Sequence, residues 1–233
     1  MRCGTGGCRP ARSTAGSARS RSITRRRSRI ENRLERLSTA DTRRAIGLAG
    51  TVILVLDALQ ALERQDLTIA NHVAEEGRAL VLALNKWDAV REREAMLKRV
   101  RDRLATTLPQ LHGVALVPVS GLTGAGLDAL MRAVFAADAV WNRRVPTAAL
   151  NRWLAVIQQR HPPPLVGARR LRLRYMTQVN TRPPSFALFA SKPGELPESY
   201  RRYLVNALRQ DFELPGTPIR MMLRKGDNPY APG

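Results

Sequence analysis

Short apolar runs alternate with amphipathic stretches through the first 140 residues of the chain. The runs have no polar interruption, as in strands buried on both faces of a parallel sheet, and cover residues 51–56, 79–84 and 114–119. Apolar residues recur at helical spacing between and after these runs, over residues 65–76, 92–108 and 127–140. This alternation predicts an α/β fold with a parallel sheet and right-handed crossovers.

The pattern changes after Trp141. A helix predicted over residues 147–159 ends before three consecutive prolines, which cannot donate backbone hydrogen bonds. Further elements follow in the order strand, strand, helix, strand, over residues 171–179, 185–189, 197–212 and 218–223. We therefore expect a compact α+β module over residues 141–233, with its boundary near residues 141–146.

The start of the chain lacks both patterns. Residues 1–29 are mostly Arg, Ser, Gly, Ala and Thr with no acidic residue, so they cannot bury enough surface to offset chain entropy, and we expect a disordered head. A transit peptide is the alternative, although no clear amphipathic stripe supports it. Helical spacing begins at Ile30, with a helix predicted over residues 39–48, so the first ordered domain is expected to cover residues 30–140.

Charge divides the chain into the same segments. The net charge is +20, but residues 1–44 carry 13 basic and 3 acidic residues, residues 45–140 carry 10 and 11, and residues 141–233 carry 16 and 5. Two strongly basic flanks favour polyanionic partners, while the neutral middle suits a small-molecule site.

Hydropathy and cysteine content exclude other classes. The longest strongly apolar stretch, residues 49–59, is interrupted by Asp57 and is too short for the roughly 20 residues of a membrane span. The two cysteines, Cys3 and Cys8, cannot build a disulfide framework and have no nearby histidine to complete a metal site. We expect a reducing, cytoplasmic location, no membrane and no resident metal site.

The candidate chemistry lies where the apolar runs end. Asn85, Lys86 and Asp88 follow the second run, and Ser120, Gly121 and Leu122 follow the third. Ligands bind at the carboxyl ends of parallel strands, which also places Asp57 on this rim. The Asp88 carboxylate can accept hydrogen bonds from both guanine donors, N1–H and N2–H, which adenine does not offer. Lys86 can lie along the base, and Asn85 can join the neighbouring loops. The turn at Ser120 can offer backbone donors to the O6 atom of guanine. The alternative is that Asn and Asp here only form turns.

From about residue 25 to residue 230 the chain resembles the C-terminal part of the Der (EngA) GTPases, ribosome-assembly factors with two tandem G domains and a KH-like domain. The matching segments lie in both predicted domains and cover residues 37–41, 55–58, 65–70, 85–88, 150–154, 161–164, 177–179, 181–184, 196–204 and 224–230. The resemblance implies that residues 30–140 are part of a P-loop NTPase-like (Ras-like) second G domain. It also implies that Asn85, Lys86 and Asp88 read guanine and that residues 120–122 are the last nucleotide motif, although the family more often has Ala at position 121.

The phosphate-binding motif of this family is absent from the sequence. A P-loop needs G-x-x-x-x-G-K-[ST], and no Gly-Lys dipeptide occurs in the chain. Two hydrogen bonds to a carboxylate are worth roughly 1.5–3 kcal/mol each, and a millimolar site needs about 4 kcal/mol. We therefore expect an N-terminally truncated family member with weak GTP or GDP binding, no Mg²⁺ ligands and little or no hydrolysis. The alternative is a non-enzymatic RNA-binding or ribosome-docking protein that keeps the G-domain remnant as a scaffold.

Arginines concentrate in the C-terminal module. They fall on its first strand and its second helix, at Arg169, Arg170, Arg172, Arg174, Arg201, Arg202 and Arg209. We interpret them as a surface for rRNA of the large ribosomal subunit, bound mainly by electrostatics because no G-x-x-G clamp is present. The alternative is a solvated basic face without a partner.

Overall fold

The computed structural model describes residues 41–166 and 169–226. The predicted disordered head, residues 1–29, lies outside the described residues, as do residues 30–40. Residues 41–48 are helical, in agreement with the helix predicted to end at Leu48. The described residues from Ile46 to Gly226 form one compact unit.

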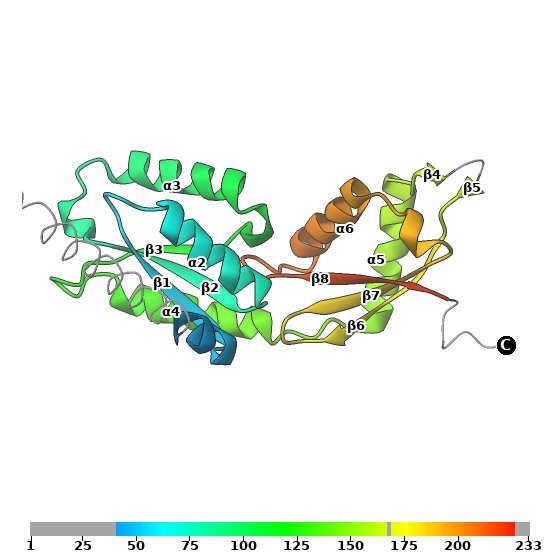
Figure 1. Cartoon of the computed structure of the whole chain (residues 1–233), viewed down its shortest axis with the longest axis horizontal. Helices are drawn as coiled ribbons and strands as arrows, with labels where there is room; N and C mark the ends of the chain where they lie inside the picture. Colours follow the sequence, from blue (N-terminus) through cyan, green and yellow to red (C-terminus); the bar gives the residue numbers. More distant parts are fainter. Residues whose placement is uncertain (1–40, 167–168, 227–233) are drawn as a thin grey trace, which may run out of the picture. The chain divides into compact units, whose positions relative to one another are not determined.

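Residues 46–141 form what we call the parallel-sheet region (Figure 1). Its three strands are parallel and adjacent in chain order: β1 (Thr51–Asp57), β2 (Ala79–Asn85) and β3 (Ala115–Pro118). Its helices are α2 (Arg64–Glu75), α3 (Arg93–Thr107) and α4 (Leu127–Trp141), with 3-10 turns η1 (Trp87–Ala89) and η2 (Pro109–Leu111). The predicted α/β fold with a parallel sheet is confirmed.

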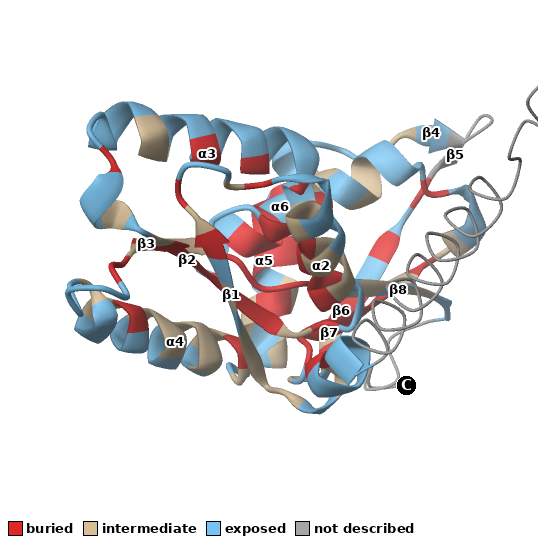
Figure 2. Cartoon of the chain, turned by 60° about the vertical axis from the view of Figure 1, so that its left-hand side comes forward, coloured by how far each residue is buried: buried red, intermediate tan, exposed pale blue. Residues whose placement is uncertain are grey.

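The central strand explains the layering of this region. Residues 79–84 of β2 are all buried (Figure 2). Successive side chains of a strand point to opposite faces of its sheet. Leu80, Leu82 and Leu84 pack with the buried residues of α2 and α3, whereas Val81 and Ala83 pack against α4. The continuous apolar run in the sequence is therefore the signature of a strand covered on both sides.

Residues 142–226 form what we call the mixed-sheet region. Its main elements are α5 (Thr147–Arg160), β6 (Leu173–Asn180), β7 (Ser185–Ala190), η3 (Pro193–Glu195), α6 (Glu198–Asp211) and β8 (Arg220–Lys225). Strands β6 and β7 are antiparallel, and β8 adds to β7 in parallel. Trp153, Phe186 and Leu204 belong to its hydrophobic cluster. The predicted α+β order is confirmed, and a short pair, β4 (Leu165–Val166) with β5 (Arg169–Arg170), was not foreseen.

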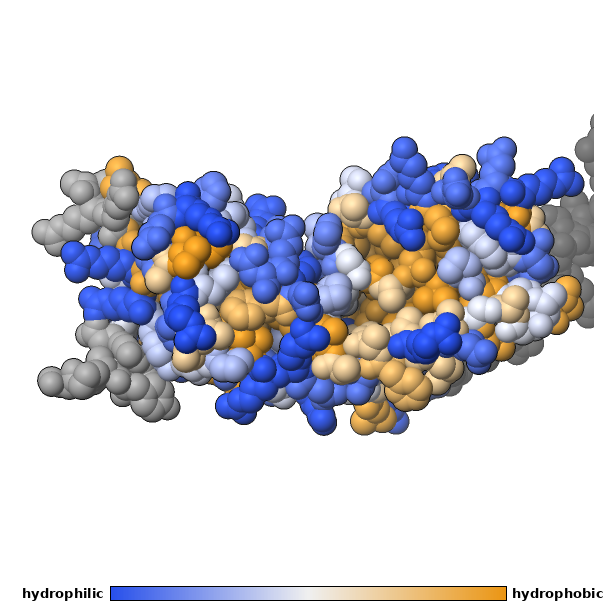
Figure 3. Space-filling view, turned by 180° about the vertical axis from the view of Figure 1, so that it is seen from behind, coloured by the Kyte–Doolittle hydropathy of each residue, from blue (hydrophilic) through white to orange (hydrophobic). Residues whose placement is uncertain are grey.

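The two regions also differ at their surfaces. Most large hydrophobic side chains that remain exposed belong to the parallel-sheet region, among them Ile53, Val55, Met131 and Phe135. Figure 3 shows hydrophobic residues gathered on the back of this region between hydrophilic margins. Within the described residues, no helix is long and apolar enough to cross a membrane.

Candidate functional site

The parallel register brings the predicted rim residues together. Asp57 at the end of β1 is the direct register partner of Asn85 at the end of β2, and the Ala58 amide donates to the Asn85 carbonyl at 2.9 Å. Beyond β3, the Val119 amide donates to the Leu84 carbonyl at 2.8 Å. Three chain segments therefore leave the sheet side by side at its carboxyl edge.

Asn85 joins the second and third of these segments. Its side-chain Oδ1 accepts a 2.9 Å hydrogen bond from the Gly121 amide. The Trp87 amide adds a second link by donating to the Val119 carbonyl at 3.1 Å. Asn85 thus has the loop-joining position that the sequence predicts.

A short hydrogen bond joins Asp88 and Ser120. The Ser120 hydroxyl donates to Asp88 Oδ1 at 2.5 Å and accepts from the Thr123 amide at 3.2 Å. Ser120 is only 2% exposed, whereas Asp88 is exposed. The serine therefore orients a carboxylate that solvent or a ligand can reach, and Thr123 is a supporting residue that sequence reasoning missed.

Lys86 pairs with Asp57, a contact that sequence reasoning also missed. Lys86 has a left-handed backbone (φ 59°, ψ 36°), and its Nζ lies 2.6 Å from Asp57 Oδ2. The hydrogen bond from Lys86 lowers the pKa of Asp57, helped by the Leu59 amide, which donates to Asp57 Oδ1 at 3.0 Å. The same pair raises the pKa of Lys86. Both groups are charged at neutral pH, so the rim presents a cation held at a fixed position.

Leu122 contributes differently from the other five predicted residues. Its side chain is 86% exposed at the turn that follows Ser120. The Ser120 amide itself donates to the Ala125 carbonyl at 2.9 Å, and the Gly124 amide donates back to the Ser120 carbonyl at 2.9 Å. The turn is therefore closed on itself, and the Leu122 side chain takes no part in the contacts that assemble the site.

The predicted basic residues divide into exposed and buried groups. Arg172, Arg174 and Arg202 are exposed, and Arg201 is partly buried with its Nη2 2.9 Å from Glu198 Oε1. Arg169 and Arg170 form β5, but their side chains lie outside the described residues. The exposed members leave a basic surface on the mixed-sheet region.

Arg209 corrects the prediction of an exposed basic row. It is 5% exposed, and its Nη2 donates to the Gln110 carbonyl at 2.9 Å and to the Thr217 carbonyl at 3.4 Å. Burial lowers the pKa of its guanidinium. Its Nη1 also donates to the Asn206 Oδ1 at 3.4 Å, so Arg209 is held inside the fold and is not part of the exposed basic surface.

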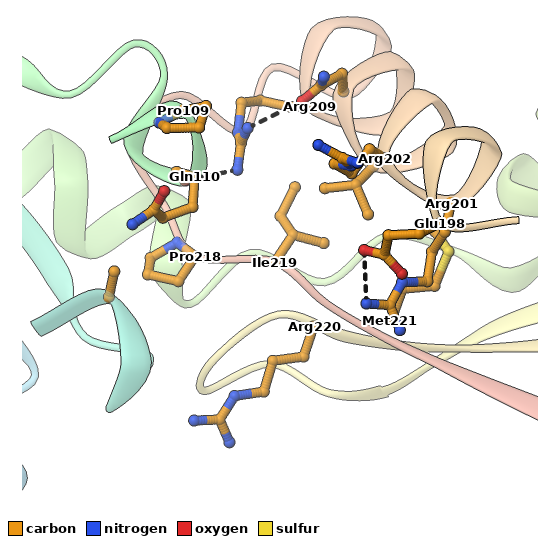
Figure 4. A pocket seen from close by; sticks show the side chains of 13 residues that line it. Pro109, Gln110, Glu198, Arg201, Arg202, Arg209, Pro218, Ile219, Arg220 and Met221 are labelled. Atoms are coloured by element: carbon orange, nitrogen blue, oxygen red, sulfur yellow. Dashed lines mark hydrogen bonds and ion pairs between the residues drawn. The ribbon is translucent and has the colours of Figure 1, made fainter. Parts of the chain in front are cut away.

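A pocket of about 510 Å³ lies beside α6 and the segment that enters β8 (Figure 4). Arg201, Arg202 and Arg220 line it together with apolar side chains such as Ile219 and Met221. The Arg220 Nη2 donates to the Glu75 carbonyl at 2.7 Å. Cationic side chains here border an apolar surface, an arrangement that suits an anionic or nucleic-acid ligand more than an apolar one.

Comparisons with known proteins agree with this geometry. Residues 39–138 match the family model of the elongation factor Tu GTP binding domain, and residues 144–224 match the KH-domain-like C-terminal region of EngA bacterial GTPase enzymes. The chain is 52% identical over 206 residues to GTPase Der of Rhizobium meliloti, and 55% identical over 207 residues to GTPase Der of Bradyrhizobium sp. strain ORS 278 and of Rhodopseudomonas palustris. These matches cover 88–89% of the chain but only 43–45% of the relatives.

Solved structures give weaker likenesses. A probable GTP-binding protein engB is 17% identical, with a TM-score of 0.39 over 48% of the chain and 68% of that protein. Aquifex aeolicus Era is 19% identical, with a TM-score of 0.37 over 81% of the chain and 69% of Era. These scores support no assignment by themselves. From the sequence matches, the chain is a homologue of the Der (EngA) GTPases, spans less than half of their length, and has a GTP-binding-domain region followed by an EngA-type KH-like region.

Proposed function

We propose that the chain binds guanine nucleotides at the carboxyl edge of its parallel sheet and binds rRNA through the basic surface of its KH-like region. It would do so in the cytoplasm, as part of a Der-type GTPase that acts in assembly of the large ribosomal subunit. The observation that carries the nucleotide half of the proposal is the Ser120–Asp88 hydrogen bond, which joins two motifs 32 residues apart at neighbouring strand ends.

Each rim residue has a separate task in this proposal. Asp88 accepts the N1–H and N2–H donors of guanine in a charge-assisted pair, and Ser120 fixes the angle of that carboxylate. Lys86, held by Asp57, lays its aliphatic stem beside the base. Asn85 keeps the turn at Gly121 close to the base. The Ser120 and Gly121 amides donate to Ala125 and Asn85, so the Leu122 amide is the donor of this turn that can face O6.

The missing phosphate-binding motif limits both the affinity for nucleotides and the hydrolysis of GTP. Because the sequence holds no Gly-Lys dipeptide, these residues read the base but do not supply the P-loop grip on the phosphates. We expect GDP and GTP to bind this chain at millimolar concentrations, and we assign no hydrolytic step to it. Within the described ranges no group of three or more His, Cys, Asp or Glu is placed to hold a metal, and we route no step through Mg²⁺.

The nucleotide proposal can be tested by exchanging the base preference. Xanthine has a carbonyl where guanine has the 2-amino group, so Asp88→Asn should weaken GDP binding by roughly 10-fold or more and improve binding of xanthosine diphosphate. Chemical-shift titration of the 233-residue chain with GDP, xanthosine diphosphate and ADP would measure this. Asp102→Asn, which changes an exposed carboxylate on α3, is the matched control and should leave all three affinities unchanged. Equal binding of ADP and GDP by the unmodified chain would contradict the proposal.

The docking alternative is favoured by the same missing dipeptide. If the parallel-sheet region is only a scaffold, rRNA or ribosomal subunits should bind while GDP and ADP are not distinguished at any concentration. Filter binding to large-subunit rRNA, run beside the nucleotide titration, separates the two functions because each has its own readout.

A further inference from the structure

Strand β1 has an open edge in the described part of the chain. It pairs with β2 on one side, and no described strand pairs with its other side. Figure 2 looks onto this edge. Ile53 and Val55 are 39% and 58% exposed, values that are high for large aliphatic side chains in a parallel sheet.

These two side chains lie on the face of the sheet that α4 covers. Ile53 is the register partner of Val81 and Val55 that of Ala83, and both partners pack against α4. In a parallel pair, register partners share a face. The helix covers β2 and β3 on this face but leaves Ile53 and Val55 of β1 only partly covered.

Helix α4 continues the apolar surface toward the open edge. Met131 and Phe135 are 46% and 68% exposed, and helical spacing places them on the same side as Asp138. Asp138 marks the direction of that side because its Oδ1 accepts a 3.4 Å hydrogen bond from the Thr51 hydroxyl, at the start of β1. Ile53, Val55, Met131 and Phe135, which we call the edge patch, therefore border the open edge of the sheet.

Charge on the chain favours this edge as a contact between copies. Residues 51–56 contain no ionisable group, and residues 45–140 carry 10 basic and 11 acidic residues. The flanking segments carry large excesses of basic residues, so two copies repel each other least when they approach through the parallel-sheet region. Monomeric proteins usually protect such an edge with a lysine, a proline or a bulge, and β1 has none of these before Asp57.

We propose that the edge patch is a self-association surface, occupied by β1 of a second copy of this chain. Antiparallel pairing about a two-fold axis at Leu54 would place Ile53 of one copy opposite Val55 of the other, and the reverse, so the patch is complementary to itself. The two-fold axis keeps both α4 helices on one face, where Met131 and Phe135 of the two copies cover the four aliphatic side chains. The three-stranded sheets of the two copies would join through their β1 strands into one six-stranded sheet.

Sedimentation velocity of the 233-residue chain, over protein concentrations from 1 to 100 µM, would test the proposal. The expected result is a concentration-dependent shift from 25.9 kDa to twice that mass. Val55→Lys should raise the dimer dissociation constant at least 10-fold, since a charge in the centre of the edge must be desolvated on pairing. Val179→Lys is the matched control: it changes a 50% exposed valine on β6, an edge strand of the other sheet, and should leave the dissociation constant unchanged.

Phe135→Lys keeps the test decisive if Val55→Lys does not fold. The substitution lies on the exposed side of a helix, outside the strand ladder, and should also weaken the dimer at least 10-fold. Hydrogen exchange gives an independent readout, because amides of β1 should become more protected as protein concentration rises. Three outcomes would overturn the proposal. The first is a monomer at 100 µM, and the second is a dimer that neither edge-patch variant weakens. The third is protection of β1 amides that does not depend on protein concentration, which would indicate that another segment of the same chain covers the edge.

Discussion

The rim of the parallel sheet and the arginines at the surface of the mixed-sheet region are positioned in opposite ways. At the rim of the parallel sheet, side chains from different segments bond to one another or to a neighbouring loop: Ser120 to Asp88, Lys86 to Asp57, and Asn85 to Gly121. On α6 of the mixed-sheet region, Arg201 pairs only with Glu198 one turn away, and Arg202 is exposed.

The difference indicates two kinds of recognition. A site whose donors and acceptors are locked at 2.5–2.9 Å can select a ligand by geometry, because the wrong base leaves polar groups unpaired. Exposed arginines on long side chains attract phosphates by charge and discriminate little among sequences. We therefore expect single substitutions to change specificity at the rim but only affinity on the basic surface.

The largest expected effect is a difference in the free energy of unfolding between variants at two arginines of α6, Arg209 and Arg202. Arg209→Ala removes a buried guanidinium and leaves the Gln110 and Thr217 carbonyls without this donor, so it should lower the free energy of unfolding by about 2–4 kcal/mol. Arg202→Ala, on the exposed side of α6, should change it by less than about 0.5 kcal/mol. Urea unfolding followed by circular dichroism measures both.

A third variant distinguishes the contribution of charge from that of packing. Arg209→Met keeps much of the buried volume without the charge that must be desolvated, and should therefore cost less than Arg209→Ala. Equal stability of Arg209→Ala and the unmodified chain would mean that Arg209 belongs with the exposed arginines after all.

The next effect concerns RNA affinity. Arg172→Gln with Arg202→Gln removes two exposed cations from the mixed-sheet region. If each contacts a phosphate of single-stranded rRNA, the slope of log K against log salt should become shallower by about 1.4, with a drop in affinity of roughly 10-fold at low salt. Filter binding at several salt concentrations measures both quantities. Arg132→Gln, an exposed change on α4, should leave the slope unaltered, and an equal loss in that control would indicate attraction by net charge alone.

The secondary structure was predictable because its signals are local. Continuous apolar runs identified the strands of the parallel sheet, and 3.6-residue spacing identified its helices, mostly to within one or two residues of their observed ends. The rim followed from topology, since parallel strands place their carboxyl ends along one edge. A four-residue motif after one strand and a Ser-Gly pair after the next were enough to place five of the six candidate residues at one edge of the sheet, where each takes part in a side-chain hydrogen bond.

The contacts that the sequence could not predict depend on distances between segments. Lys86 pairs with a residue 29 positions away, and Arg209 bonds to a carbonyl 99 positions away. A charged residue on an amphipathic helix is usually exposed, and this general rule predicts a surface position for Arg209. One local signal indicates that the aliphatic stem of Arg209 borders the core. Arg209 comes four residues after Val205 and directly after the buried Leu208.

The smallest expected effect tests whether the rim pair exists in solution. Lys86→Met should raise the pKa of Asp57 toward the ordinary value of about 3.9, because the hydrogen bond from Lys86 is the largest cause of its depression. The lowered pKa of Asp57 stabilises the fold above about pH 4, and this contribution is lost as pH falls through the folded-state pKa. The raised pKa of Lys86 stabilises the fold below about pH 10, and this contribution is lost as pH rises through its folded-state value. Between these limits the pair adds no pH dependence.

An NMR titration of the Asp57 carboxyl group, in the unmodified chain and in Lys86→Met, measures this shift directly. Repeating it in 1 M salt should reduce the difference between the two proteins, because both side chains reach solvent and their attraction is screened. Leu59 should still donate its amide to Asp57 in the variant, so the pKa should move only part of the way. An unchanged pKa would mean that Lys86 does not pair with Asp57 in solution, and the position of its stem beside a base would then depend on the ligand rather than on the rim.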